Sequence, residues 1–471
     1  MKVYFALVVL FLSFHFNAFS QSLAEKIGKS FAVFEADRNL KYGIASLTVM
    51  NARTGEIIYS KYENLGMAPA STLKAVTLAT AYHVLGKDFR YRTDLLYSGV
   101  INNGILEGDI IIKGSGDPSL GSDHYRETRA DVILKRWTDA IKAAGIKKVV
   151  GRIIADDSMF NGQMAPEGWI WTDMGQYYGA GVSALNWREN KMGVIFSAKG
   201  RVGNPVSLVK TVSISSDVEI VNEVKIGSAG SGDQVYAYSA PYSKKIILRG
   251  TYGSDLNKEV EISLPDGAYE AASSLKLALI KQGIVVDDKV TTAFLLQSEG
   301  KDLPANTKLL DRYLSPNLDQ LAYWFLKESI NLYGEALLKT SAFHEGIATK
   351  TSDAAAWEKK FWANQLGIDE GALKIMDGSG LSPENRVSTL SMVKVLNEAK
   401  KQSWFASYYE NIPLVNNMKM KSGTIDGVLG YVGYHTSKGG TPLIFAFLVN
   451  NHEGRASSMR QKMFKVLDSL K

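Results

Sequence analysis

The secondary-structure pattern changes twice along the 471 residues of the chain, and these changes constrain the fold more than any other feature. Both ends mix helical and strand patterns. Between about residues 90 and 300, short runs of β-branched and aromatic residues alternate with turn residues, and residues 200–266 carry no helical pattern. The length favours about three domains. We therefore predict one α/β (α+β) domain built from both ends and split by a large β-rich insertion.

Composition excludes several classes of protein. Hydrophobic residues make up 45% and charged residues 22%, a balance typical of a soluble globular protein. The absence of cysteine excludes disulfides, thiol catalysis, thiolate metal sites and iron–sulfur clusters. The net charge of +6 is spread over 54 basic and 48 acidic residues, which is too diluted to indicate nucleic-acid binding. The histidines lack the spacing of metal ligands, so we predict no metal. We likewise predict no nucleic-acid partner and no cofactor.

The N-terminus predicts export. Lys2 precedes an apolar run over residues 3–14 that is short for a membrane span. Ala18-Phe19-Ser20 then offers a small-x-small cleavage site. We predict that residues 1–20 are a signal peptide that is removed from the mature protein. The alternative is an uncleaved N-terminal anchor.

A Ser-x-x-Lys pattern is the first candidate nucleophile. A serine at a helix start with a lysine one turn later brings an amine beside a hydroxyl, and a desolvated lysine near another cation can act as a base. Ser71 has this context because it follows Pro69-Ala70 and begins an apolar helix. The alternative for Ser71 is a helix N-cap with an exposed lysine. The pattern occurs five times, at Ser71/Lys74, Ser207/Lys210, Ser273/Lys276, Ser298/Lys301 and Ser391/Lys394.

Two further motifs carry polar side chains in ordered segments. Ser329-Ile330-Asn331 interrupts a helical stretch, and we predict a break between two helices that presents a hydroxyl and an amide. Lys421-Ser422-Gly423-Thr424 precedes a strand pair, and the glycine would let a substrate backbone approach closely. Lysine supplies positive potential there and a backbone N–H can serve an oxyanion hole. A solvated helix face and an ordinary hairpin strand are the alternatives.

The order of the three motifs makes them specific as a set. Ser-x-x-Lys, Ser-x-Asn and Lys-Ser-Gly together match the motif set of penicillin-binding proteins and β-lactamases. The wide gap between Lys74 and Ser329 resembles peptidase family S13, the low-molecular-mass class C penicillin-binding proteins, where two further domains fill the gap. Other strings that resemble this family are residues 116–118, 156–160, 178–186, 331–338 and 377–382.

The resemblance implies a fold and a division of the chain. We expect a serine β-lactamase/transpeptidase-like catalytic domain from residues 21–88 plus 305–471. Residues 89–190 plus 265–304 would form an inserted second domain, and residues 191–264 an inserted all-β third domain.

The resemblance also implies an activity. We expect a serine-type D-Ala-D-Ala carboxypeptidase/endopeptidase that trims peptidoglycan stem peptides and cross-bridges in the periplasm. β-Lactam antibiotics would be covalent inhibitors. Peripheral membrane association and oligomeric state stay open. The alternatives are a β-lactamase or esterase on the same fold, and a non-catalytic cell-wall-binding protein.

The catalytic roles follow from the same resemblance. Ser71 would attack the carbonyl and Lys74 would take its proton. Ser329 would relay a proton to the leaving amine beside Lys421, and Asn331 would orient the substrate amide.

Substrate contacts are expected on both sides of the site. The Ser422 and Thr424 hydroxyls would bind a carboxylate next to Gly423, and the N–H groups of Ser71 and Thr424 would form the oxyanion hole. Asp156 would bind the amine of the diamino acid, although a turn carboxylate at a strand end is an equal alternative. Pro383 stands where several relatives have a basic residue, and Arg386 is the expected substitute.

Overall fold

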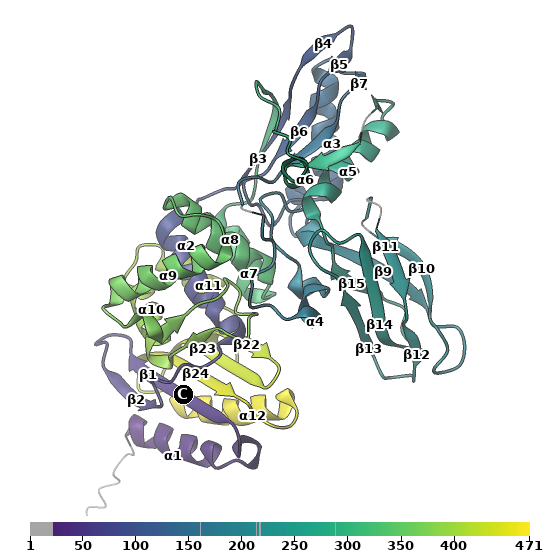
Figure 1. The fold of residues 1–471 in the computed structure, drawn as a ribbon. Helices are drawn as coiled ribbons and strands as arrows, with labels where there is room; N and C mark the ends of the chain where they lie inside the picture. The colour runs from purple at the N-terminus through teal and green to yellow at the C-terminus, as the bar shows by residue number, and fades with distance from the viewer. Residues whose placement is uncertain (1–21, 161, 213, 216–217, 288) are drawn as a thin grey trace, which may run out of the picture.

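The computed structural model describes residues 22–471 except residues 161, 213, 216–217 and 288, so the predicted signal peptide at 1–20 lies outside the described residues. The two ends of the chain form one domain, and the middle extends away from it as two further bodies (Figure 1). No helix in the described part is both long and apolar enough to cross a membrane.

A six-stranded antiparallel sheet joins the two ends of the chain. N-terminal β1 pairs with C-terminal β24 along its whole length, from Ile44 opposite Asn450 to Asn51 opposite Leu443. The strand order is β2-β1-β24-β23-β22-β21. The strands are β1 (Ile44–Asn51), β2 (Ile57–Lys61), β21 (Leu414–Val415), β22 (Met418–Ile425), β23 (Val428–Thr436) and β24 (Pro442–Asn450).

Helices cover both faces of this sheet, which explains the continuous apolar run of β24. Phe445 and Phe447 pack on one face against α1 (Leu23–Glu35) and α12 (Ala456–Leu467). Ile444, Ala446 and Leu448 point to the other face. The helices on that face are α2 (Lys74–Leu85), α7 (Leu318–Lys327), α8 (Asn331–His344), α9 (Thr351–Leu366), α10 (Thr389–Lys400) and α11 (Phe405–Asn411).

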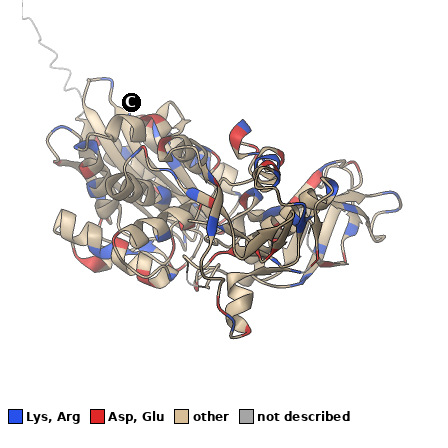
Figure 2. Ribbon diagram, turned by 90° about the horizontal axis from the view of Figure 1, so that it is seen from above, with Lys and Arg blue, Asp and Glu red and all other residues tan. Residues whose placement is uncertain are grey.

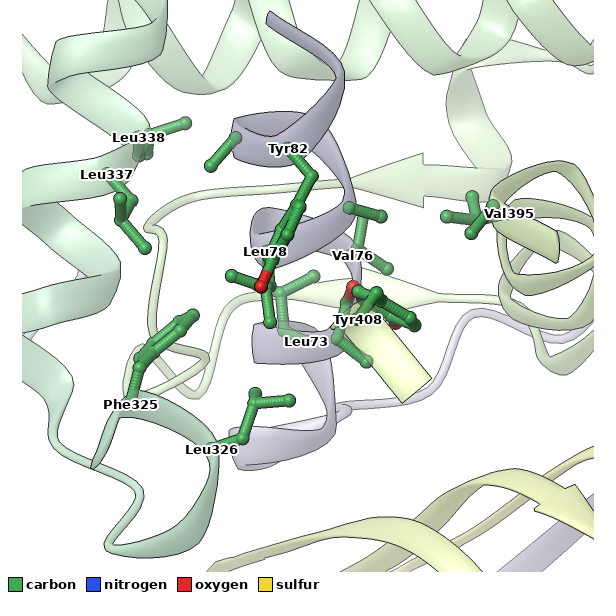
Figure 3. Packing of buried hydrophobic residues seen from close by; sticks show 14 of the residues in the cluster. Leu73, Val76, Leu78, Tyr82, Phe325, Leu326, Leu337, Leu338, Val395 and Tyr408 are labelled. Atoms are coloured by element: carbon green, nitrogen blue, oxygen red, sulfur yellow. The ribbon is translucent and has the colours of Figure 1, made fainter. Parts of the chain in front are cut away.

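Helix α2 is the central element of this helical layer. Every residue from Lys74 to Tyr82 is buried, so the helix has no solvent face over that length. In Figure 3, Leu78 and Tyr82 lie among side chains of the surrounding helices. Each Å² of apolar surface removed from water stabilises the fold by about 25 cal/mol. The packing around α2 therefore fixes the start of the helix in the core.

The first inserted body is a mixed domain. Its five-stranded sheet has the order β17-β8-β6-β3-β18 and packs against α3 (Ala130–Ala143) and α5 (Gly267–Lys281). The strands are β3 (Arg92–Tyr97), β6 (Ile110–Lys113), β8 (Ile153–Asp156), β17 (Val290–Thr292) and β18 (Lys308–Leu314). A smaller sheet adds β4 (Val100–Asn102), β5 (Ile105–Glu107), β7 (Lys148–Val149) and β16 (Val285–Val286), and α6 (Ala293–Ser298) follows β17.

The second catalytic segment was predicted to start at residue 305, but strand β18 after that residue belongs to the mixed domain. It pairs antiparallel with β3, and its Tyr313 is buried in the core of the mixed domain. On the other side of the insertion, Tyr91 packs in the catalytic core, beyond the predicted end at residue 88. The chain therefore crosses between the two bodies next to Tyr91 and Ser315, where Ser315 N donates to Tyr91 O at 3.0 Å.

The second inserted body is a β-sandwich. The sheet β10-β9-β15 faces a second sheet in which β14 pairs with β11, β12 and β13, and residues such as Val194 and Leu248 fill the space between. The described part of residues 191–264 contains strands and no helix. The strands are β9 (Lys191–Ser197), β10 (Ser207–Val212), β11 (Glu219–Asn222), β12 (Lys225–Gly227), β13 (Asp233–Tyr238), β14 (Lys245–Gly253) and β15 (Glu259–Ser263).

A tight turn over Ala70–Leu73 precedes α2 and is pressed between two glycines. A Cβ on Gly423 of β22 would lie 2.6 Å from Pro69 O and 2.8 Å from Ser71 N. A Cβ on Gly380 would lie only 2.0 Å from Ala70 O. Ala70 itself has a φ of +46°, which is uncommon for a residue with a side chain. The backbone that carries Ser71 is therefore held from both sides.

Gly380→Ala tests this close packing. Gly380 and Gly440 have nearly the same φ, +81° and +79°, but a Cβ on Gly440 would meet no atom within 4 Å. We expect Gly440→Ala to lower the free energy of unfolding by about 1–2 kcal/mol through backbone strain alone. Gly380→Ala should cost about 1–3 kcal/mol more because of the clash. Urea unfolding of both variants measures the difference, and equal losses would contradict the packing argument.

Candidate active site

A cavity of about 890 Å³ lies at the predicted motifs. Its catalytic-domain wall includes Ser71, Ser329, Asn331 and Thr424. Its other wall comes from the inserted bodies and includes Asp173, Tyr177, Tyr178 and Tyr236. Figure 2 shows Lys/Arg and Asp/Glu scattered along all parts of the ribbon, so charge singles out no other surface. The described residues also contain no cluster of three or more His, Asp or Glu side chains that could hold a metal.

Ser71 lies in the turn immediately before α2 and is half-buried. Neither the turn nor the helix has a side-chain capping bond, and Lys74 is fully buried. The alternative of an N-cap with an exposed lysine is therefore wrong. Ser391, which begins another of the five Ser-x-x-Lys matches, is also buried, and its hydroxyl donates to Ala372 O at 3.0 Å and Ser388 O at 2.8 Å.

Lys74 Nζ has three oxygen neighbours. It lies 2.9 Å from Ser71 Oγ, 2.6 Å from Asn331 Oδ1 and 2.7 Å from Ser379 O. The amide and carbonyl oxygens can only accept hydrogen bonds. In a neutral amine, both hydrogens are therefore committed to Asn331 and Ser379, and the lone pair points at the Ser71 hydroxyl. This geometry arranges a base against a nucleophile.

The electrostatics favour the neutral amine. Burial lowers the pKa of Lys74 well below its ordinary value, and the nearby positive charge of Lys421 lowers it further. Asp377 and Glu335 act in the opposite direction but do not reverse the shift. A lysine with a depressed pKa can accept the serine proton near neutral pH.

Ser329 lies in the predicted break between helices. Helix α7 ends at Lys327, α8 begins at Asn331, and Ser329 has a φ of +58°. Lys421 Nζ donates to Ser329 Oγ at 2.9 Å and to Ser422 O at 2.7 Å. Burial lowers the pKa of Lys421 to about 7. Asn331 Nδ2 donates to Tyr178 O at 2.7 Å, which connects the motif to the opposite wall.

The loop over residues 377–382 holds the third acceptor of Lys74. Glu335 accepts the backbone N–H groups of Gly378 at 3.1 Å and Ser379 at 2.9 Å. Asp377 accepts those of Gly380 and Ser382 and the Trp169 Nε1–H. The sequence indicated this loop only as a resembling string, and its role in fixing Ser379 O was missed. An acidic residue beside two glycines was the available signal.

Strand β22 borders the cavity on the side of the third motif. Thr424 is exposed and lines the cavity, whereas Ser422 does not line it. Strand β21 pairs only with Met418 and Lys419, so no described strand covers the outer edge of Lys421–Ile425. That edge is open to pair with an extended peptide.

Besides Ser422, the predicted substrate residues Asp156 and Arg386 do not line the cavity. Asp156 is buried at the end of β8, where Oδ1 accepts from the Ser158 hydroxyl at 2.6 Å and Oδ2 lies 3.7 Å from Lys113 Nζ. Arg386 donates to the carbonyls of Pro383 and Asn385. Neither side chain lines the cavity, whereas Asp173, which the sequence did not single out, does.

Comparison with known proteins gives a consistent result. The sequence profile described as the D-Ala-D-Ala carboxypeptidase 3 (S13) family matches residues 28–416. A D-alanyl-D-alanine carboxypeptidase of Actinomadura sp. is 25% identical over 455 residues, covering 89% of this chain and 80% of that protein. D-alanyl-D-alanine carboxypeptidase DacB of Haemophilus influenzae is 26% identical over 426 residues, covering 85% and 84%.

Solved structures show the same fold. Penicillin binding protein 4 of Haemophilus influenzae superposes with a TM-score of 0.79 at 22% identity, covering 93% of this chain and 97% of that chain. Its complex with a β-lactam superposes with a TM-score of 0.72 and covers 91% and 95%. The mixed α/β catalytic domain split by an insertion is therefore the penicillin-binding protein fold.

From the lowered pKa values of the two lysines we expect pH to affect acylation by a β-lactam and the initial binding of the β-lactam in opposite ways. The acylation rate constant should rise with pH and level off well below 10.5, the ordinary pKa of lysine, because the neutral Lys74 is the base. The dissociation constant of the initial complex should increase above about pH 7, where Lys421 loses its charge. Stopped-flow acylation from pH 5 to 10 separates the two. A rate that still rises steeply beyond pH 10 would contradict the depressed pKa of Lys74.

Proposed function

The chain belongs to the D-Ala-D-Ala carboxypeptidase 3 (S13) family, and from this membership we propose that it cleaves peptidoglycan stem peptides through an ester on Ser71. It is a serine-type D-alanyl-D-alanine carboxypeptidase and therefore a hydrolase. The observation that supports Ser71 as the nucleophile is the Lys74 amine, 2.9 Å from Ser71 Oγ with its other contacts made to acceptors.

Acylation follows from the site geometry. Ser71 Oγ attacks the carbonyl carbon of the penultimate D-Ala, and its proton passes to Lys74 Nζ. The N–H groups of Ser71 and Thr424 stabilise the oxyanion, a contribution of about 10²–10³ in rate for each donor. As the C–N bond breaks, the leaving amine takes a proton from Ser329, which is replenished by Lys421 at 2.9 Å.

Deacylation and substrate binding use the same groups. Proton exchange with solvent first returns Lys74 to its neutral form and Lys421 to its charged form. A water molecule then attacks the ester carbonyl and gives its proton to Lys74, which passes it to Ser71 Oγ as the C–O bond breaks and the shortened peptide leaves. The Thr424 hydroxyl and the charge of Lys421 bind the terminal carboxylate, and the open edge of β22 pairs with the peptide backbone. A β-lactam presents an amide of similar shape, so it acylates Ser71 and remains attached.

Cross-bridge cleavage is part of the proposal. The cavity of about 890 Å³ is far larger than a dipeptide requires, and its second wall is built by the inserted bodies. A cross-linked stem, whose leaving group is a second peptide rather than free D-Ala, fits this volume. We therefore propose endopeptidase activity at the same Ser71.

Ser71→Ala should abolish labelling by a fluorescent penicillin and release of D-Ala from linear and cross-linked muropeptides. Removing the nucleophile leaves no ester to form, so the loss should exceed about 10³-fold. Ser207→Ala is the matched control, because Ser207 also has a lysine three residues later but is exposed on strand β10. Gel fluorescence and mass spectrometry of the products measure both activities. Label retained by Ser71→Ala would exclude Ser71, and intact cross-linked muropeptides with the unmodified protein would exclude the endopeptidase activity.

We also propose export to the periplasm, supported by Lys2, the apolar residues 3–14 and the small residues Ala18 and Ser20. Expression of the full chain in a Gram-negative host should place the protein in the periplasmic fraction with Gln21 as its first residue. Intact mass and N-terminal sequencing measure this. Retention of Met1 on the purified protein would contradict cleavage.

A further inference from the structure

Three consecutive residues of the inserted segment have an unusual backbone. Arg188, Glu189 and Asn190 have φ values of +52°, +57° and +51°. This left-handed region is disfavoured for residues with side chains, and Glu and Arg enter it less readily than Asn. Such a conformation persists only where the surroundings fix it, and it concentrates at functional positions. The run lies where the chain leaves the mixed domain and enters β9 of the sandwich.

The surroundings do fix this run. Asn190 Nδ2 donates to Gly181 O at 2.7 Å and to Asn186 Oδ1 at 2.8 Å, and Asn190 Oδ1 accepts from Trp187 N at 2.9 Å. Arg188 N donates to Leu120 O at 2.8 Å. The conformation is therefore imposed from several directions, and its effect is to aim the side chain of Glu189.

The carboxylate of Glu189 lies at the meeting point of all three bodies and is only 4% exposed. Its Oε1 accepts from the Tyr333 hydroxyl of α8 at 3.0 Å and lies 2.7 Å from His124 Nε2 of the mixed domain. Its Oε2 lies 3.0 Å from Lys191 Nζ of the sandwich. Burial alone would raise its pKa, but the contacts with His124 and Lys191 hold the pKa below its ordinary value, so the group is charged.

These contacts reach both helices beside the Ser-x-Asn motif. Tyr333 is in the first turn of α8, two residues after Asn331. The His124 ring stacks on Trp324 of α7, with ring centroids 4.0 Å apart and an angle of 13° between the planes. One buried carboxylate thus contacts the helix after the break directly and the helix before it through His124.

We propose that Glu189 is a positioning residue that sets Ser329 and Asn331 against the two lysines of the active site. The Asn331–Lys74 contact of 2.6 Å and the Ser329–Lys421 contact of 2.9 Å both depend on where α7 and α8 lie. A shift of a fraction of an ångström in either helix weakens proton transfer while leaving the cavity intact. The inference rests on the proposed acylation of Ser71.

The test compares Tyr333→Phe, Glu189→Gln and the double variant with the unmodified protein. Tyr333→Phe removes a single hydroxyl and keeps the ring in the core. We expect its acylation rate constant with a β-lactam to fall about tenfold, with the dissociation constant of the initial complex changed less than about twofold. Glu189→Gln should lower the rate constant at least as much. The effect of the double variant should be smaller than the product of the two single effects, because Glu189→Gln removes the charge that accepts the Tyr333 hydroxyl and Tyr333→Phe removes the hydroxyl itself.

Tyr434→Phe is the matched control. Tyr434 is buried in the same domain, and its hydroxyl donates to Leu396 O at 2.8 Å, away from the motif. It should lose similar thermal stability and keep the rate constant of the unmodified protein. Unchanged rates in Tyr333→Phe and Glu189→Gln, or an equal fall in Tyr434→Phe, would overturn the positioning role. Absence of acylation in the unmodified protein would instead overturn the proposed function.

Discussion

The burial of the Lys74 amine is the constraint on which the rest of the site depends. A lysine that is 0% exposed needs a hydrogen-bond partner for every hydrogen, or it destabilises the fold. Its oxygen partners are Ser71 Oγ, Asn331 Oδ1 and Ser379 O, which come from three separate segments of the catalytic domain. The split domain can therefore place this amine only when both ends of the chain have folded together. The pairing of β1 with β24 provides that closure.

A second consequence is that the two active-site lysines have different roles in proton transfer. Burial lowers the pKa of both amines, and the positive charge of Lys421 lowers the pKa of Lys74 further. Lys74 faces the nucleophile, whereas Lys421 faces Ser329 on the leaving-group side. The site thus holds a base and an acid made from the same side chain type, distinguished only by their surroundings.

The sequence predicted the parts of the site whose signal is local. The helix start at Ser71, the break at Ser329 and the strand at Lys421 each carry their own turn or pattern residues, and their order in the chain identified the set. The role of β18 could not be predicted, because its membership in the mixed sheet depends on pairing with β3, more than two hundred residues away. Asp156 was expected from a resembling string, with a turn carboxylate as the equal alternative, and it contacts Ser158 and Lys113. Arg386 was expected only as a substitute for the basic residue that Pro383 replaces, and it donates to neighbouring backbone carbonyls.

Glu189 shows where sequence reasoning stops. Nothing in Arg188-Glu189-Asn190 indicates a left-handed backbone, because two of the three residues disfavour it and the cause is tertiary. Its contacts also change how the insertion is understood. Two crossings near Tyr91 and Ser315 would by themselves allow the inserted bodies to swing, but Tyr178 O contacts Asn331 and Glu189 contacts Tyr333. Any such swing would break these two contacts with α8, so the insertion is tied to the helix that carries Asn331.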